Sequence, residues 1–138
     1  MSEKRQLRVC LTPALFPLYA DRKSIVVVVD VLRATSAMCT AFKYGINRII
    51  PVSTVEEALD YRDVDDIILA AERNGKQVRG FDFGNSPLQY QKNDVKGKTL
   101  VMTTTNGTKA INIAKRDHQV VIGSFLNIDA LTDWLAKQ

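Results

Sequence analysis

Three carboxylates in the sequence could form a metal site built from oxygen ligands: Asp30, Glu72 and Asp82. Asp30 and Glu72 each follow directly on an apolar run that is typical of a buried strand, and Asp82 stands between two phenylalanines. Carboxylate oxygens are the ligands that Mg²⁺ prefers in proteins. We expect these three residues to bind Mg²⁺ and to take part in catalysis. The alternative roles are helix capping for Asp30 and a structural pair with an arginine for Asp82.

Other kinds of site find little support in the sequence. The single histidine, His118, lies in a charged stretch typical of a solvated loop, so neither a three-histidine zinc site nor a Ser-His-Asp triad is expected. Cys10 and Cys39 lack a Cys-x-x-Cys spacing and are predicted to be buried free thiols. The glycines form no G-x-G-x-x-G dinucleotide-binding motif. The chemistry must therefore depend on carboxylates, hydroxyls, amides, arginine or a hard metal ion.

A second group of residues could bind an anion. The segment 104–108, Thr-Thr-Asn-Gly-Thr, precedes a predicted helix, and exposed amides at a helix N-terminus attract phosphate, sulfonate or carboxylate groups. Arg33 follows Asp30 closely enough to clamp such an anion from the neighbouring strand end. A simple turn at 104–108 and a surface position for Arg33 are the alternatives. We expect Arg33 to be catalytic and nine residues to contact the substrate: Thr35, Ser36, Asn85, Ser86, Thr104, Thr105, Asn106, Gly107 and Thr108.

These residues need a sheet to bring them together, and the sequence predicts one. Strand patterns occupy 7–11, 25–29, 48–52, 67–71, 99–103 and 119–122. They alternate with helical patterns at 33–44, from 54, at 86–91, at 107–115 and from 129. In the last of these helices, Leu131, Trp134 and Leu135 are expected to be buried. Such alternation indicates a three-layer α/β/α sandwich with a mostly parallel sheet, formed by residues 1–138 as a single α/β domain. The β-branched run 25–29 is typical of a central strand covered on both faces. Ligands of such sheets bind beyond the carboxyl ends of the strands.

The composition is that of an ordinary globular protein, with 138 residues, 46% hydrophobic and 25% charged, and a formal net charge of +4. The basic residues are scattered rather than gathered with aromatic residues, so nucleic-acid binding is not expected. No apolar run is long enough to span a bilayer, and no apolar segment follows the charged N-terminus. We therefore expect no membrane association and a cytoplasmic location. The mild positive charge suits a small anionic ligand.

Five segments together resemble the signature blocks of the 2-phosphosulfolactate phosphatase family. They are 30–36 (DVLRATS), 71–75 (AERNG), 80–87 (GFDFGNSP), 103–108 (TTTNGT) and 124–127 (SFLN), in the family's order. The resemblance implies a magnesium-dependent acid phosphatase that hydrolyses 2-phosphosulfolactate to sulfolactate and phosphate, a step toward coenzyme M. Members of the family continue into a C-terminal half with an acidic stretch, whereas this sequence ends at Gln138. Its partner could therefore be a separate C-terminal half or further copies in a homo-oligomer.

Two classes of function follow from these observations. The first is a phosphatase acting on a small phosphoester, and the alternative is a catalytically inert anion-binding or assembly domain that keeps the shape of the site. For a phosphatase, we expect water rather than Asp30 to attack phosphorus. The reason is that Leu32 stands where phosphatases with an aspartate nucleophile carry a second aspartate. The proton donor would then be Asp82, Glu72 or a group from the C-terminal half.

Overall fold

The computed structural model describes residues 6–21, 23–91 and 93–138, in which strands alternate with helices and confirm the α/β class. The strands are β1 (Ile25–Val29), β2 (Arg48–Pro51), β3 (Ile67–Arg73), β4 (Lys76–Gln77), β5 (Thr99–Thr103) and β6 (Gln119–Gly123). The α-helices are α1 (Phe16–Tyr19), α2 (Ala34–Lys43), α3 (Val55–Leu59), α4 (Gly107–Ala114) and α5 (Ile128–Leu135). Short 3₁₀ helices occur at Pro13–Leu15, Pro87–Tyr90, Asn93–Val95 and Phe125–Asn127.

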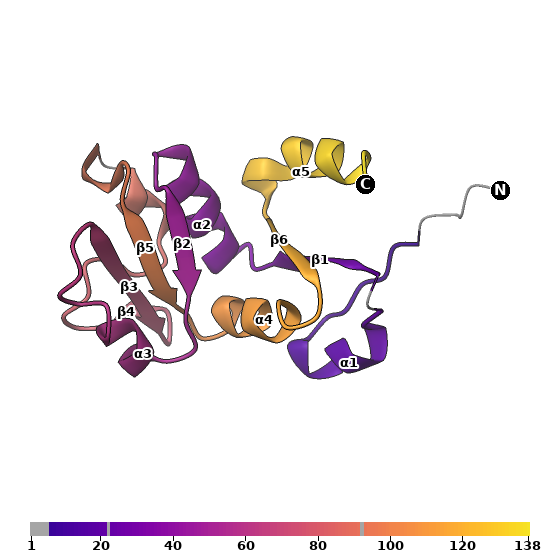
Figure 1. Cartoon of the computed structure of the whole chain (residues 1–138), viewed down its shortest axis with the longest axis horizontal. Coiled ribbons are helices and arrows are strands. Elements are labelled where there is room, and N and C mark those ends of the chain that lie inside the picture. The colour runs from indigo at the N-terminus through magenta and orange to yellow at the C-terminus, as the bar shows by residue number, and fades with distance from the viewer. Residues whose placement is uncertain (1–5, 22, 92) are drawn as a thin grey trace.

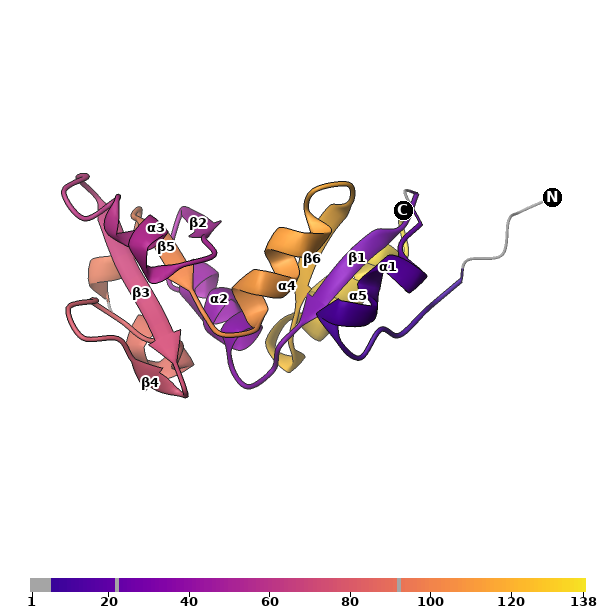
Figure 2. The same ribbon diagram turned by 90° about the horizontal axis from the view of Figure 1, so that it is seen from below.

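The strands lie in two sheets. β2, β5, β3 and β4 form one sheet in that order, in which β5 is parallel to β2 and β3, and β4 returns antiparallel to β3. β1 and β6 pair in parallel as a second sheet, and α2 and α4 lie between the two sheets (Figures 1 and 2). The parallel pairing agrees with the prediction, but the strands divide between two sheets instead of forming one. Alternation along a sequence indicates parallel strands, whereas it does not encode which strands become neighbours.

Strand β5 is covered on both faces and forms the centre of the larger sheet. Leu100 and Met102 pack into one apolar cluster with Met38 of α2, and Val101 between them packs into a second cluster on the opposite face. All three strand residues are fully buried. Because consecutive residues of a strand face opposite sides, this pattern fixes β5 between two layers of apolar side chains. The carboxyl ends of β5 and its neighbour β3 are thereby held at one edge of the sheet.

The ends of α2 and α3 follow from local sequence signals. Thr54 caps α3 by accepting a hydrogen bond from the amide of Glu57, and the Glu57 carboxylate accepts one from the amide of Ser53, close to the predicted capping box. Gly45, with φ of 98°, ends α2 in the left-handed conformation that glycine adopts without strain. The amide of Ile46 then donates to the carbonyl of Ala41, which completes the helix end.

Three predicted features differ in the structure, and they involve the two ends of the chain and β1. Residues 7–11 form no strand, and Leu7, Val9 and Leu11 are 93%, 66% and 88% exposed. β1 is not a central strand, since among the described residues it pairs with β6 alone and leaves Val29 62% exposed. The expected burial of the apolar side chains of α5 is also wrong, because none of its residues is buried. Each of these patterns needs a packing partner that the described part of the chain does not supply.

Three single residues also differ from expectation. Cys10 and Cys39 are free thiols as predicted, but both are only half-buried. His118 is half-buried rather than solvated, and its ring lies edge-on to Phe16 with the ring centroids 5.4 Å apart.

In the described part of the chain, no helix combines the length and the apolar character needed to cross a membrane.

Candidate functional site

An open pocket of about 260 Å³ lies where β1 and β3 end and α2 and α4 begin. It is lined by six residues expected in the site (Asp30, Arg33, Glu72, Asn85, Thr105 and Asn106) and by Leu32, Asn74 and Gly75. Although β1 and β3 belong to different sheets, their ends meet here because α2 and α4 begin side by side. A Cβ placed on Gly107, the first residue of α4, would overlap the Cβ of Ala34, the first residue of α2. The structure therefore brings six of the thirteen predicted site residues into the lining of one pocket.

The carboxylate of Glu72 ties three loops to the end of β3. It accepts hydrogen bonds from the amide of Gly75 at 2.6 Å, from the amide and hydroxyl of Thr105 at 3.3 Å, and from the Asn85 side-chain amide at 3.5 Å. Glu72 is only 6% exposed. A buried carboxylate is tolerated where donors surround it, so these contacts account for its burial and fix the shape of the pocket.

Arg33 extends over the same pocket from the start of α2. Its Nη2 donates to the carbonyl oxygen of Gly75 at 3.0 Å and to Oδ1 of Asn85 at 2.8 Å. Asn85 therefore contacts Arg33 through its oxygen and Glu72 through its nitrogen. The guanidinium is held in place by neutral acceptors, which leaves its positive charge for an anionic ligand. Arg33 is half-buried and lines the pocket.

Asp30 follows β1 at the other side of the pocket. Burial raises the pKa of its carboxyl above the ordinary value of 3.8, the amide of Ala34 acts to lower this pKa, and the negative charge of Glu72 raises it further. The influence of Glu72 means that two carboxylates share one partly buried space. A bound cation would relieve both the burial and the repulsion.

The hydroxyls that follow Asp30 hold the backbone around the pocket instead of lining it. Thr35 is fully buried, accepts a hydrogen bond from the amide of Asp30 and donates one to the carbonyl of Gly123 at 2.7 Å. Ser36 donates to the carbonyl of Val31 at 2.7 Å. Thr35 thus joins the carboxyl ends of β1 and β6, and the expected substrate contacts of these two side chains are replaced by backbone contacts.

The segment 104–108 is similarly divided between framework and lining. Thr104 and Thr108 are buried, and each hydroxyl accepts a hydrogen bond from the amide of the other residue. The amide of Thr105 donates to Glu72. Of this segment only Thr105 and Asn106 line the pocket, so the anion site at the N-terminus of α4 is smaller than the sequence predicted.

Asp82 does not join the other two carboxylates, and the predicted grouping of three is corrected here. Its Oδ2 accepts a hydrogen bond from the amide of Leu69 at 2.9 Å, and its own amide donates to the carbonyl of Leu69. Leu69 precedes Glu72 by three residues, which is about 10 Å along a strand. In the described part of the chain, no three His, Cys, Asp or Glu side chains form a group that could hold a metal ion.

Ser86 precedes the 3₁₀ helix Pro87–Tyr90 as expected and does not line the pocket.

Sequence reasoning missed the contribution of the turn between β3 and β4. Asn74 and Gly75 line the pocket with φ of 54° and 76°, and the Gly75 carbonyl accepts from Arg33. An Asn-Gly pair after a strand is a turn signal, so this part could have been found. Arg73 was also missed: it donates to the carbonyl of Glu72 and to the hydroxyl of Thr103, joining the ends of β3 and β5.

The donor set of the pocket fits Mg²⁺. Asp30 and Glu72 supply two carboxylates, and the charge of Glu72 acts on the Asp30 carboxyl. Proteins commonly bind Mg²⁺ through one or two carboxylates together with phosphate groups of the substrate and water. Glu72 already accepts several hydrogen bonds, so Asp30 has the more available oxygens.

Comparison with known proteins adds an independent observation. The sequence profile described as 2-phosphosulpholactate phosphatase matches residues 10–138. The chain is 48% identical over 112 residues to a protein of Thermotoga petrophila, 49% over 115 residues to one of Clostridium acetobutylicum and 46% over 112 residues to one of Thermotoga maritima, each named probable 2-phosphosulfolactate phosphatase. The matches cover 80–81% of this chain and 48% of each relative. The chain thus spans about half the length of the relatives that it matches.

Proposed function

The chain belongs to the 2-phosphosulfolactate phosphatase family, and we propose that its pocket hydrolyses a small phosphoester, such as 2-phosphosulfolactate, to an alcohol such as sulfolactate and phosphate. One observation carries this proposal: Asp30, Glu72 and Arg33 converge at the N-termini of two helices. The names of the relatives support the same reaction class. A place for this reaction on the way to coenzyme M rests on the family resemblance alone.

The residues of the pocket can neutralise the charge of a phosphoryl group. Hydrolysis of a phosphate monoester depends mainly on positioning and on stabilising negative charge on the phosphoryl oxygens. Arg33 would bind these oxygens from one side, and the amide of Asn106 would bind them from the N-terminus of α4. Asn85 would keep Arg33 oriented, because it accepts from the guanidinium at 2.8 Å.

Asp30 and Glu72 would hold Mg²⁺, with Asp30 contributing the more accessible oxygens. The ion, when bound, supplies positive charge against the phosphoryl oxygens. Water then forms the new bond to phosphorus, the bond to the ester oxygen breaks, and a proton is transferred to the leaving oxygen. With Asp82 bonded to β3 and the two pocket carboxylates bound to the ion, we propose that the proton donor comes from the other half of a family-length protein.

Phosphate release from 2-phosphosulfolactate, measured with and without Mg²⁺, tests the proposal. Hydrolysis that requires Mg²⁺ and is lost in Asp30→Asn is the expected result for the chain assayed together with the second half of a relative. Binding of phosphate or sulfolactate without turnover in every combination would instead favour the inert anion-binding domain. Single-turnover hydrolysis in ¹⁸O-labelled water identifies the nucleophile, because attack by water places the label in phosphate and attack by Asp30 places it in the carboxylate.

A further inference from the structure

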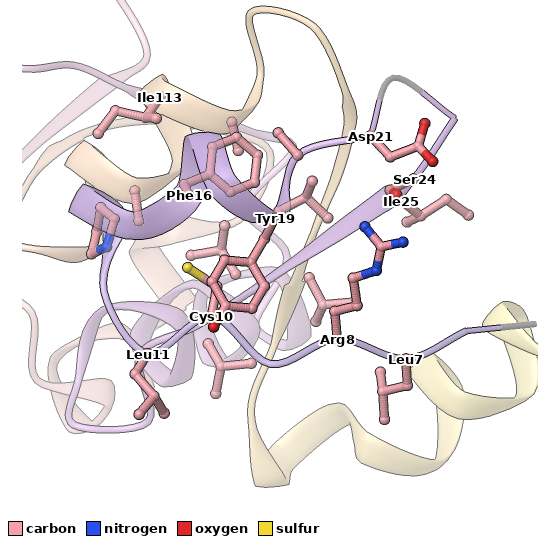
Figure 3. Close-up of a pocket in the computed structure, with 18 of the residues that line it drawn as sticks. Leu7, Arg8, Cys10, Leu11, Phe16, Tyr19, Asp21, Ser24, Ile25 and Ile113 are labelled. Atoms are coloured by element: carbon pink, nitrogen blue, oxygen red, sulfur yellow. The ribbon is translucent and has the colours of Figure 1, made fainter.

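A second, larger hollow of about 1600 Å³ lies around β1 and is lined by the N-terminal segment, α1, α4 and the end of α5. Figure 3 shows side chains from the N-terminal segment (Leu7, Leu11), from α1 (Phe16, Tyr19) and from α4 (Ile113) around it. Among the described residues, Asp30 and Asn106 alone line both this hollow and the pocket that contains Arg33 and Glu72.

The strand at the base of this hollow lacks a partner on one edge. In the described residues β1 pairs with β6 only, and a two-stranded sheet is marginally stable without further packing. The amide and carbonyl groups along the free edge can pair with another strand. The sequence of β1, Ile-Val-Val-Val-Val, is typical of a strand covered on both faces. Its side chains are instead mostly half-buried, and Val29 is 62% exposed.

The apolar surface extends beyond β1. Leu7 and Leu11 are 93% and 88% exposed and line the hollow together with apolar residues of α4. Contiguous exposed apolar surface of this kind marks a site of protein contact. The end of α5 also borders the hollow, through Leu135, Ala136 and Gln138. The matched region is only 48% of each relative, so about half of each relative lies outside it.

We propose that the hollow is the docking surface for the second half of a family-length protein, which adds a β-strand to the free edge of β1 and covers Leu7 and Leu11. This proposal does not depend on catalysis, since it rests on the strand edge, the exposed apolar side chains and the length of the relatives. It explains why the pattern 7–11 and the β-branched run of β1 are left without the burial that their sequences predict.

Hydrogen–deuterium exchange tests this docking in the 138-residue chain and in the same chain fused to the second half of the Thermotoga maritima relative. In a paired strand the amides on both edges are protected, so exchange at the free-edge amides of residues 25–29 should slow at least ~10-fold in the fusion. Unchanged exchange, or a fusion that is unfolded by circular dichroism while the short chain is folded, would overturn the proposal.

Two matched variants locate the surface. The pair Leu7→Asp and Leu11→Asp should restore fast exchange at β1 in the fusion, whereas Leu88→Asp should not, because Leu88 is 72% exposed but lies outside the hollow. Equal behaviour of the two variants would overturn the assignment of the surface. Protection of β1 that rises with the concentration of the short chain alone would mean that a second copy covers the hollow, which also contradicts the proposed occupant.

Discussion

The backbone of Gly107 lies directly against the side chain of Ala34, so that no side chain fits at position 107. An added Cβ would overlap the Cβ of Ala34 and come within 3.0 Å of Oδ2 of Asp30. This glycine is required by the close approach of two helices and not by its backbone angles. The contact places the first turn of α4 beside the end of β1, next to the pocket that is lined by Asp30, Arg33 and Glu72.

The substitution Gly107→Ala should lower the free energy of unfolding by about 1–3 kcal/mol, the usual cost of overpacking a site. Urea denaturation measures this change. Adding Ala34→Gly removes one of the two overlapping atoms and should restore part of the loss, while the contact with Asp30 persists. Independent, additive effects of the two substitutions would show that α2 and α4 do not meet in this way.

Replacing Arg33 with alanine should weaken binding of phosphate and of sulfolactate. A hydrogen bond to a charged group contributes roughly 1.5–3 kcal/mol, which corresponds to about a 10- to 150-fold loss of affinity by calorimetry. Arg62→Ala is the matched control, because Arg62 is exposed and contacts the carbonyl of Gly80 outside the pocket. Equal affinities of Arg33→Ala and the unmodified chain would remove Arg33 from the anion site.

The substitution Glu72→Gln should destabilise the protein although it keeps the size of the side chain. One carboxylate oxygen is replaced by an NH₂ group that faces donors from Gly75, Thr105 or Asn85, so at least one donor at the buried Glu72 side chain loses its acceptor. The expected loss in the free energy of unfolding is about 1–3 kcal/mol. Glu56→Gln, at an exposed position of α3, should change it much less. Similar stability of the two variants would contradict the central place of Glu72.

Magnesium should stabilise the folded chain through Asp30 and not through Asp82. A ligand that binds only the folded state raises the midpoint of thermal unfolding as its concentration rises. We expect Asp30→Asn to abolish this rise and Asp82→Asn to leave it intact, because Asp82 is bonded to the amide of Leu69. The reverse order of effects in a Mg²⁺ titration would show that the ion binds elsewhere.

Without Mg²⁺, Asp30 should make stability fall as the pH rises. Burial raises the pKa of the folded carboxyl above its ordinary 3.8, so the folded state holds this proton more tightly than the unfolded state. Its unfavourable contribution is absent below pH 3.8 and grows as the pH rises toward the folded pKa. The stability of Asp30→Asn relative to the unmodified chain should therefore increase from low to neutral pH in urea titrations. A difference that does not vary with pH would disprove this.

The fold class could be predicted from the sequence because it depends on local patterns. Three such patterns act within a few residues, and the structure confirms each of them. The β-branched run forms the strand β1, Thr54 begins α3, and Gly45 ends α2. The division into two sheets could not be predicted. It depends on which strands pair across long connections, and the apolar pattern of a strand is the same whichever neighbour it takes.

The site could be predicted only in part for a similar reason. Asp30, Glu72 and Arg33 can be predicted because each follows closely on an apolar run in the sequence, although β3 extends through Glu72. The position of Asp82 depends on the path of the chain after β4, which returns its amide to the middle of β3. The sequence predicts that the hydroxyls of Thr35 and Thr104 contact the ligand, whereas in the structure they form hydrogen bonds with the backbone. The spacing of residues does not tell which of the two a hydroxyl faces.

Because one carboxylate, that of Glu72, accepts hydrogen bonds from the β3–β4 turn, from Asn85 and from Thr105, these three loops cannot diverge independently during evolution. A replacement in one loop that shifts Glu72 alters the acceptor on which the other two depend, so its effect should depend on the residues present in those loops. Grafting a single loop from a distant relative should then impair the protein more than exchanging all three together.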